Sequence, residues 1–152
     1  MFTWQAILSG AQETPPNASP ATGSGSGTYD DITNLLTWTV TYSGLVALRT
    51  AAHFHNAPPG VNGPVQYAIG GAGPMADTLI GMVAITDPQE VQLLAGNWYL
   101  NVHSTTFPGG EIRGQVSVTA IPEPIPEPAT ASLCVVALLG ALVFRRRFGA
   151  AP

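Results

Sequence analysis

Positive charge, thiols and imidazoles are all scarce in this sequence. Its 152 residues include no lysine, one cysteine and three histidines, and only 9% of them are charged. Residues 1–120 carry two arginines against seven acidic residues, which excludes the clustered positive charge on which nucleic-acid binding depends. The cysteine, Cys134, lies in the C-terminal tail. Residues 1–120 therefore contain no disulfide, and a metal site there cannot use a thiolate ligand.

Turn-forming residues are abundant, with 17 glycines and 14 prolines, and 45% of the chain is hydrophobic. This composition favours an all-β domain with many loops. Residues 35–43 alternate strictly between apolar and polar side chains, which is typical of a half-buried antiparallel strand. Further strands are predicted at residues 78–86, 97–104 and 111–119. The first of these, 78–86, is more apolar than the alternating 35–43 strand, and we expect it to be central in the sheet.

Two segments between the predicted strands have distinct patterns. Residues 87–96 predict one short helix, with Asp87 as its cap, Glu90 completing a capping box and Gly96 as its end. The glycine-serine segment 21–31 is expected to be a flexible connection between two strands. We therefore predict that residues 1–120 form a Greek-key β-sandwich or barrel of antiparallel strands with one short helix.

The last thirty residues change character. Residues 121–130 form a proline-rich spacer, and residues 131–144 are apolar, which predicts a hydrophobic tail helix within 131–152. Three basic residues follow the apolar run, and we expect them to stay on the cytoplasmic side of a membrane. They are Arg145, Arg146 and Arg147.

This tail resembles the PEP-CTERM sorting signal, through a Pro-Glu-Pro motif, the apolar run and the basic end. The motif is either Pro122, Glu123 and Pro124 or Pro126, Glu127 and Pro128. The resemblance implies a bacterial protein that is exported, transiently anchored in the inner membrane, and processed by an exosortase-type enzyme. It also implies a final location at the cell surface or outside the cell. Export needs a signal peptide, which residues 1–10 do not resemble, so we expect the start of the chain to be trimmed or wrongly assigned.

The histidines form the clearest candidate site. His53 and His55 are two positions apart in a predicted strand, so their side chains point to the same side. His103 lies on the polar face of the strand predicted at 97–104, together with Asn101. Three imidazole nitrogens suit copper or zinc, with a further coordination position open to water or substrate. The alternative interpretation is structural, with the histidines bracing loops through hydrogen bonds.

Most of residues 1–120 resembles the chordin-type, or CHRD, domain. The resemblance rests on five segments that occur in the family's order, at residues 8–25, 42–45, 52–65, 93–104 and 107–116. It implies export, since bacterial members are usually exported, but it implies no defined activity. Glu13 and Glu111 match acidic residues that are characteristic of the family. Each is expected either to hold a loop by accepting backbone N–H groups or to orient an imidazole.

A weaker similarity links the histidines to Cu/Zn superoxide dismutases. His53 and His55 match the paired copper ligands of those enzymes, and His103 matches a later one. The bridging histidine and the zinc ligands have no counterpart here, so the similarity implies a single copper ion, with zinc as an alternative metal. It also implies that Arg113 attracts an anion. The alternative for Arg113 is an outward-facing salt bridge with Glu111 or another acid.

Together these patterns predict an exported bacterial protein that binds one copper ion through His53, His55 and His103, with redox activity an open question. The sequence leaves two alternatives. One is a non-catalytic structural module of the cell surface or extracellular matrix. The other is a superoxide-dismutase-like copper enzyme, whose substrate the sequence does not otherwise identify.

Overall fold

The computed structural model describes residues 1–122, which include nine strands, one α-helix and one short 3₁₀ helix. The predicted tail helix, Cys134, the Pro126–Pro128 motif and the three terminal arginines lie outside the described residues. Within residues 1–122, no helix has the length and apolarity that crossing a membrane requires. The elements are β1 (Phe2–Ser9), η1 (Gly10–Gln12), β2 (Thr22–Asp30), β3 (Leu35–Ser43), β4 (Arg49–Asn56), β5 (Val65–Gly70), β6 (Asp77–Ala84), α1 (Asp87–Leu94), β7 (Trp98–Ser104), β8 (Ile112–Gln115) and β9 (Ser117–Ala120).

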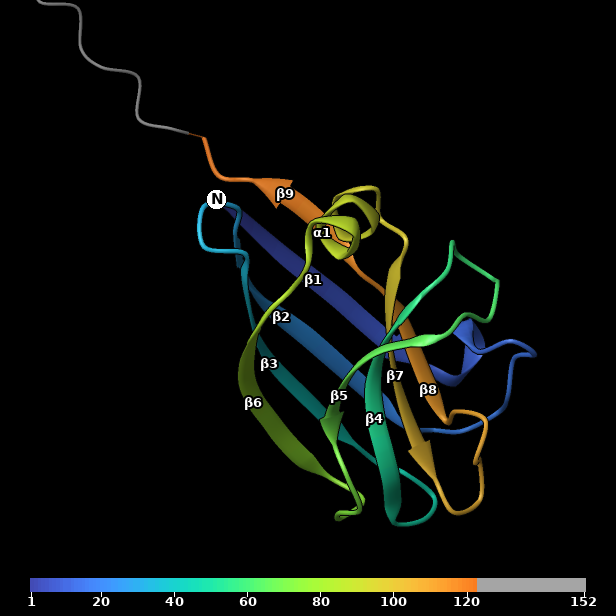
Figure 1. The fold of residues 1–152 in the computed structure, drawn as a ribbon. Coiled ribbons are helices and arrows are strands. Elements are labelled where there is room, and N and C mark those ends of the chain that lie inside the picture. The colour runs from blue at the N-terminus through green and yellow to red at the C-terminus, as the bar shows by residue number, and fades with distance from the viewer. Residues whose placement is uncertain (123–152) are drawn as a thin grey trace, which may run out of the picture. The chain divides into compact units, whose positions relative to one another are not determined.

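The strands form one antiparallel sheet that rolls into a nearly closed barrel. Their order is β5-β4-β7-β8-β1-β2-β3-β6, and β9 pairs with β1 beyond the end of β8. The two ends of this order, β5 and β6, come into contact and bring the sheet back on itself (Figure 1). The all-β antiparallel fold with one short helix is therefore confirmed.

Alternation along the strands fills the inside of the barrel. In β3, the side chains of Leu36, Trp38, Val40 and Tyr42 are buried, while the threonines between them face outward, as the sequence predicts. Aromatic side chains meet at the centre, where Phe54 of β4 packs edge-to-face against Trp4 and Trp38. Burying each such side chain contributes roughly 1.5–3 kcal/mol, so this core holds β4 rigidly on one side.

The glycine-serine segment is a strand rather than a flexible connection. β2 pairs along its length with β1 and, through most of it, with β3. Its inward positions before Tyr29 are the glycines Gly23, Gly25 and Gly27, and they leave room for large core side chains. A Cβ atom on Gly25 would lie 2.5 Å from Leu100 Cδ1, and one on Gly27 would lie 2.7 Å from Trp4 Nε1. The low strand propensity of glycine is therefore outweighed by the packing of neighbouring side chains into the space that it leaves.

Three details of the predicted strands and helix are wrong. β6 lies at the end of the sheet order rather than in its centre, and its Ile80 and Met82 are exposed. The strand predicted at 111–119 is divided at Val116, which lies between the end of β8 and the start of β9, although its N–H still donates to the Trp98 carbonyl of β7. The cap of α1 is Thr86 rather than Asp87. The end of the helix is as predicted: Ala95 is the C-cap, and Gly96 follows it with a φ of 73°.

Replacing Thr86 with alanine should destabilise the protein by about 1 kcal/mol. Gln89 Oε1 accepts one hydrogen bond from the Thr86 N–H at 2.9 Å and another from the Thr86 hydroxyl at 3.1 Å. The variant loses the hydroxyl and therefore the second of these bonds at the first turn. Urea denaturation of the purified protein measures the change. Val91→Ala, on the exposed face of the same helix, is the control and should change stability by at most about 0.5 kcal/mol. Equal effects of the two substitutions would contradict the assignment of Thr86 as the cap.

Candidate metal centre

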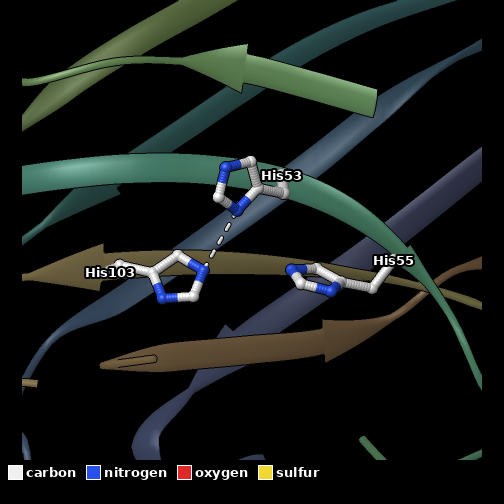
Figure 2. A group of neighbouring side chains, drawn as sticks. All are labelled: His53, His55 and His103. Carbon is white, nitrogen blue, oxygen red and sulfur yellow. Dashed lines mark hydrogen bonds between the residues drawn. The ribbon is translucent and has the colours of Figure 1, made fainter. Parts of the chain in front are cut away.

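Pairing between β4 and β7 brings the three histidines together. His55 lies opposite Tyr99, His53 opposite Asn101, and Ala51 opposite His103. The intervening Phe54 and Ala52 are buried in the core, so His53 and His55 project from the other face of β4, as predicted. His103 projects from β7 on the same side. Figure 2 shows the three rings close together beside these two strands.

The distances between the rings suit a common metal ion. One nitrogen from each histidine can be chosen so that all three lie within 4.8 Å of one another. His53 Nδ1 and His103 Nε2 are 3.2 Å apart, the interaction drawn in Figure 2. Two nitrogens bound to one tetrahedral Zn²⁺ at 2.0–2.1 Å are about 3.4 Å apart. Small rotations of the rings would therefore place the three nitrogens at coordination distance.

Backbone carbonyls orient two of the imidazoles. His55 Nδ1 lies 3.0 Å from the Gly63 carbonyl oxygen, and His103 Nδ1 lies 3.0 Å from that of Pro108. A carbonyl oxygen only accepts, so each Nδ1 carries the hydrogen and each Nε2 has its lone pair available as an acceptor or a ligand. The lone pair of His103 Nε2 faces His53 Nδ1, 3.2 Å away. His55 Nε2 is buried and has no hydrogen-bond partner among the described residues. This is the arrangement of a metal-binding imidazole whose other nitrogen donates to an orienting group.

The electrostatic surroundings keep the imidazoles neutral. Burial lowers the pKa of His53, His55 and His103 below the usual 6.5. Mutual repulsion of the charged forms lowers the pKa of His55 and His103 further, against the opposing effect of their carbonyl partners. The Arg113 guanidinium also lowers the pKa of His55. A metal ion needs deprotonated ligands, and at neutral pH these three meet that condition.

The sequence-based prediction missed the partners of these histidines. The Tyr99 ring stacks on the His55 ring with a centroid distance of 4.8 Å and an interplanar angle of 8°. The alternation of Tyr99, Asn101 and His103 in β7 was a signal that Tyr99 shares the face of the site. No comparable signal identifies the carbonyls of Gly63 and Pro108, because any residue offers one.

Arg113 is buried rather than outward-facing. Its side chain is only 2% exposed, and its guanidinium lies over the Tyr99 ring, 3.4 Å from the ring centroid. The ion pairs within residues 1–122 are Met1 with Asp31 and Arg49 with Asp77, so the predicted salt bridge to Glu111 is not formed. Anion attraction by Arg113 stays a prediction.

Asn101 contacts Glu13, whereas Glu111 has other hydrogen-bond partners. Asn101 Nδ2 donates to both carboxylate oxygens of Glu13, at 3.0 and 3.2 Å. Burial raises the pKa of Glu13 from 4.5 to about 7, although Arg113 and hydrogen bonds oppose the rise. Glu13 lines two clefts of about 400 and 340 Å³. Glu111 is fully buried, and its Oε1 accepts from Ser19 Oγ at 2.7 Å and from the Val46 backbone N–H at 2.8 Å.

The donor set narrows the choice of metal. Three imidazole nitrogens favour copper or zinc over calcium or magnesium, which prefer oxygen ligands. Neither Glu13 nor Glu111 belongs to the group of His, Cys, Asp and Glu side chains that converge here among residues 1–122. The site therefore offers three neutral nitrogens and no ligand charge of its own.

Comparison with known proteins identifies the domain. No curated protein matches the chain. The sequence model of the CHRD domain matches residues 4–116, a range that includes the three histidines, Glu13, Glu111 and Arg113. The chain therefore belongs to the CHRD domain family.

Proposed function

We propose that this CHRD domain binds a single copper ion through His53, His55 and His103. The observation that supports the proposal is the convergence of three nitrogens from two adjacent strands, two of them oriented by backbone carbonyls. Imidazole sites generally hold Cu²⁺ more tightly than other divalent first-row metals, including Zn²⁺. Zinc is the alternative metal, because three histidines with a fourth open position are also a zinc arrangement.

We also propose that the protein acts outside the cytoplasm, at the surface of a bacterium or beyond it. Membership of the CHRD family supports an extracellular module. The PEP-CTERM-like motif Pro126–Pro128, the apolar run and Arg145–Arg147 support transient membrane anchoring and processing by an exosortase-type enzyme. A measurement of where the tagged full-length protein is found, with and without Glu127→Ala, tests this part of the proposal.

Copper stoichiometry tests the metal site directly. We expect the full-length protein to retain about one copper per chain after dialysis, measured by elemental analysis, with a Cu²⁺ spectrum of nitrogen coordination. Cys134→Ser is the matched control, since the tail thiol is the other strong copper ligand in the chain, and it should retain the same amount. Loss of copper from this control, or a wild-type protein that retains none, would reject the proposal.

A structural module is the second candidate function. His55 and His103 already brace the loops at Gly63 and Pro108 through hydrogen bonds that need no metal. If the protein binds no copper or zinc and His55→Ala lowers its melting temperature, the structural interpretation is supported. The superoxide-dismutase-like alternative predicts that the copper-loaded protein dismutates superoxide, and measuring the rate of this reaction tests it.

A further inference from the structure

The buried arginine of β8 raises a separate question. Arg113 is 2% exposed, and removing a guanidinium from water is costly unless every donor finds a partner. Its hydrogen-bond acceptors all belong to the loop that follows β4. Arg113 Nη2 donates to the carbonyls of Val61 at 2.8 Å and Pro58 at 3.5 Å, and Nη1 donates to Asn62 Oδ1 at 3.2 Å. Arg113 forms no salt bridge among residues 1–122, although the Glu13 carboxylate attracts it from a greater distance, so its direct hydrogen bonds all hold it to this loop.

The same loop holds His55. The Gly63 carbonyl accepts from His55 Nδ1, and the Gly63 N–H donates to the Tyr99 hydroxyl at 3.1 Å. Gly63 fits tightly, because a Cβ atom there would overlap the Asn56 carbonyl oxygen. Tyr99 contacts both His55 and Arg113. Its ring stacks on the His55 ring and makes a cation–π contact with the Arg113 guanidinium. Arg113 and His55 are therefore linked twice, through the loop and through the Tyr99 ring.

We propose that Arg113, together with Tyr99, is a positioning residue for the metal ligand His55. The guanidinium fixes the loop at residues 58–62, the loop fixes the Gly63 carbonyl, and this carbonyl fixes the hydrogen of His55 on Nδ1. The Nε2 lone pair then points into the site before any metal binds. The proposal rests on the proposed copper site, but the state of the imidazole can be measured without metal. His103 provides an internal reference, because its Nδ1 is held by Pro108, in a loop that Arg113 does not contact through these bonds.

Nitrogen-15 NMR of the metal-free protein tests this directly. In the wild type we expect both His55 and His103 to show the form with hydrogen on Nδ1. In Arg113→Lys, which keeps the charge but loses the forked contacts, His55 should become a mixture of the two forms and His103 should not change. Tyr99→Phe should shift His55 in the same direction by a smaller amount, since only the hydroxyl partner of Gly63 is lost. It also serves as the test if Arg113→Lys does not fold.

Arg49→Lys is the matched control. Arg49 is also a buried arginine, but it donates to the Gly71 carbonyl at 2.8 Å, in a different loop. The Arg49→Lys variant should leave the His55 signal unchanged even if the substitution lowers stability. An unchanged His55 signal in both folded Arg113→Lys and Tyr99→Phe would overturn the proposal.

Copper binding adds a second measurement. Loss of a group that orients a metal-binding imidazole typically weakens binding by 10- to 100-fold, and we expect this range for Arg113→Lys, with altered copper hyperfine splitting. If the wild type binds no copper, the copper-site proposal fails while the NMR result still decides the positioning role. If the wild type binds copper and Arg113→Lys binds it equally well with the same spectrum, the positioning role fails alone.

Discussion

Replacing His55 with alanine is expected to weaken copper binding by more than about 100-fold. Losing only the group that orients a metal-binding imidazole weakens metal binding by up to about 100-fold. His55→Ala removes the ligand itself, including the buried Nε2, which has no hydrogen-bond partner among residues 1–122. The remaining pair, His53 and His103, leaves two nitrogens 3.2 Å apart on one side of the site. Competition titration with a copper chelator measures the affinity of each variant.

Ser104→Ala is the matched control for this experiment. Ser104 is fully buried next to His103 on β7, but its side chain faces the opposite way and accepts a hydrogen bond from the Phe107 N–H. Its loss should cost some stability and leave copper affinity within a factor of about 3. Equal weakening in both variants would point to a general loosening of β7 rather than to a ligand, and unchanged affinity in His55→Ala would place the copper elsewhere.

The second large effect concerns stability and pH. Glu13→Gln should make the metal-free protein more stable relative to wild type as the pH rises from 5 to 8, by about 2 kcal/mol. The pKa of Glu13 is raised by burial from 4.5 to about 7. The folded protein therefore binds this proton more tightly than the unfolded chain does. The stability that this tighter proton binding gives the wild type is fully present below pH 4.5 and is lost as the pH rises through about 7.

The comparison must be made between variants at each pH, because the histidines act in the opposite direction. Their lowered pKa values make the wild type less stable as the pH falls below 6.5. This effect is common to the wild type and Glu13→Gln, so it cancels in the difference. Urea denaturation at pH 5, 6, 7 and 8 with a chelator present supplies the four differences. A difference that stays constant over this range would show that Glu13 is ionised throughout.

The local patterns in the sequence predicted the parts of the site that depend on one strand. The alternation in residues 35–43 identified β3 because one face of that strand is buried and the other is not. The spacing of His53 and His55 identified a shared face for the same reason. His103 could be added because it alternates with core residues on β7.

The contacts between distant segments could not be predicted in this way. Arg113 looked outward-facing because it alternates with Ile112, yet the loop at residues 58–62 covers the polar side of β8 and buries it. β2 looked flexible because its glycines have no side chains, although its neighbours β1 and β3 supply the packing. In both cases the deciding atoms come from another segment: Val61 is 52 residues from Arg113, and β2 depends on the neighbouring strands β1 and β3.

The glycines of β2 have a further consequence for how the barrel finds its correct alignment during folding. Glycine and small hydroxyl side chains alternate from Thr22 to Thr28, so a shift of this strand by two residues would place like residues on like. Register is weakly specified in such glycine-rich strands. Tyr29 breaks the degeneracy, because it is fully buried and its hydroxyl donates to Asn34 Oδ1 at 2.9 Å. A single aromatic side chain thus selects one alignment among several near-equivalent ones for the strand that lies between β1 and β3.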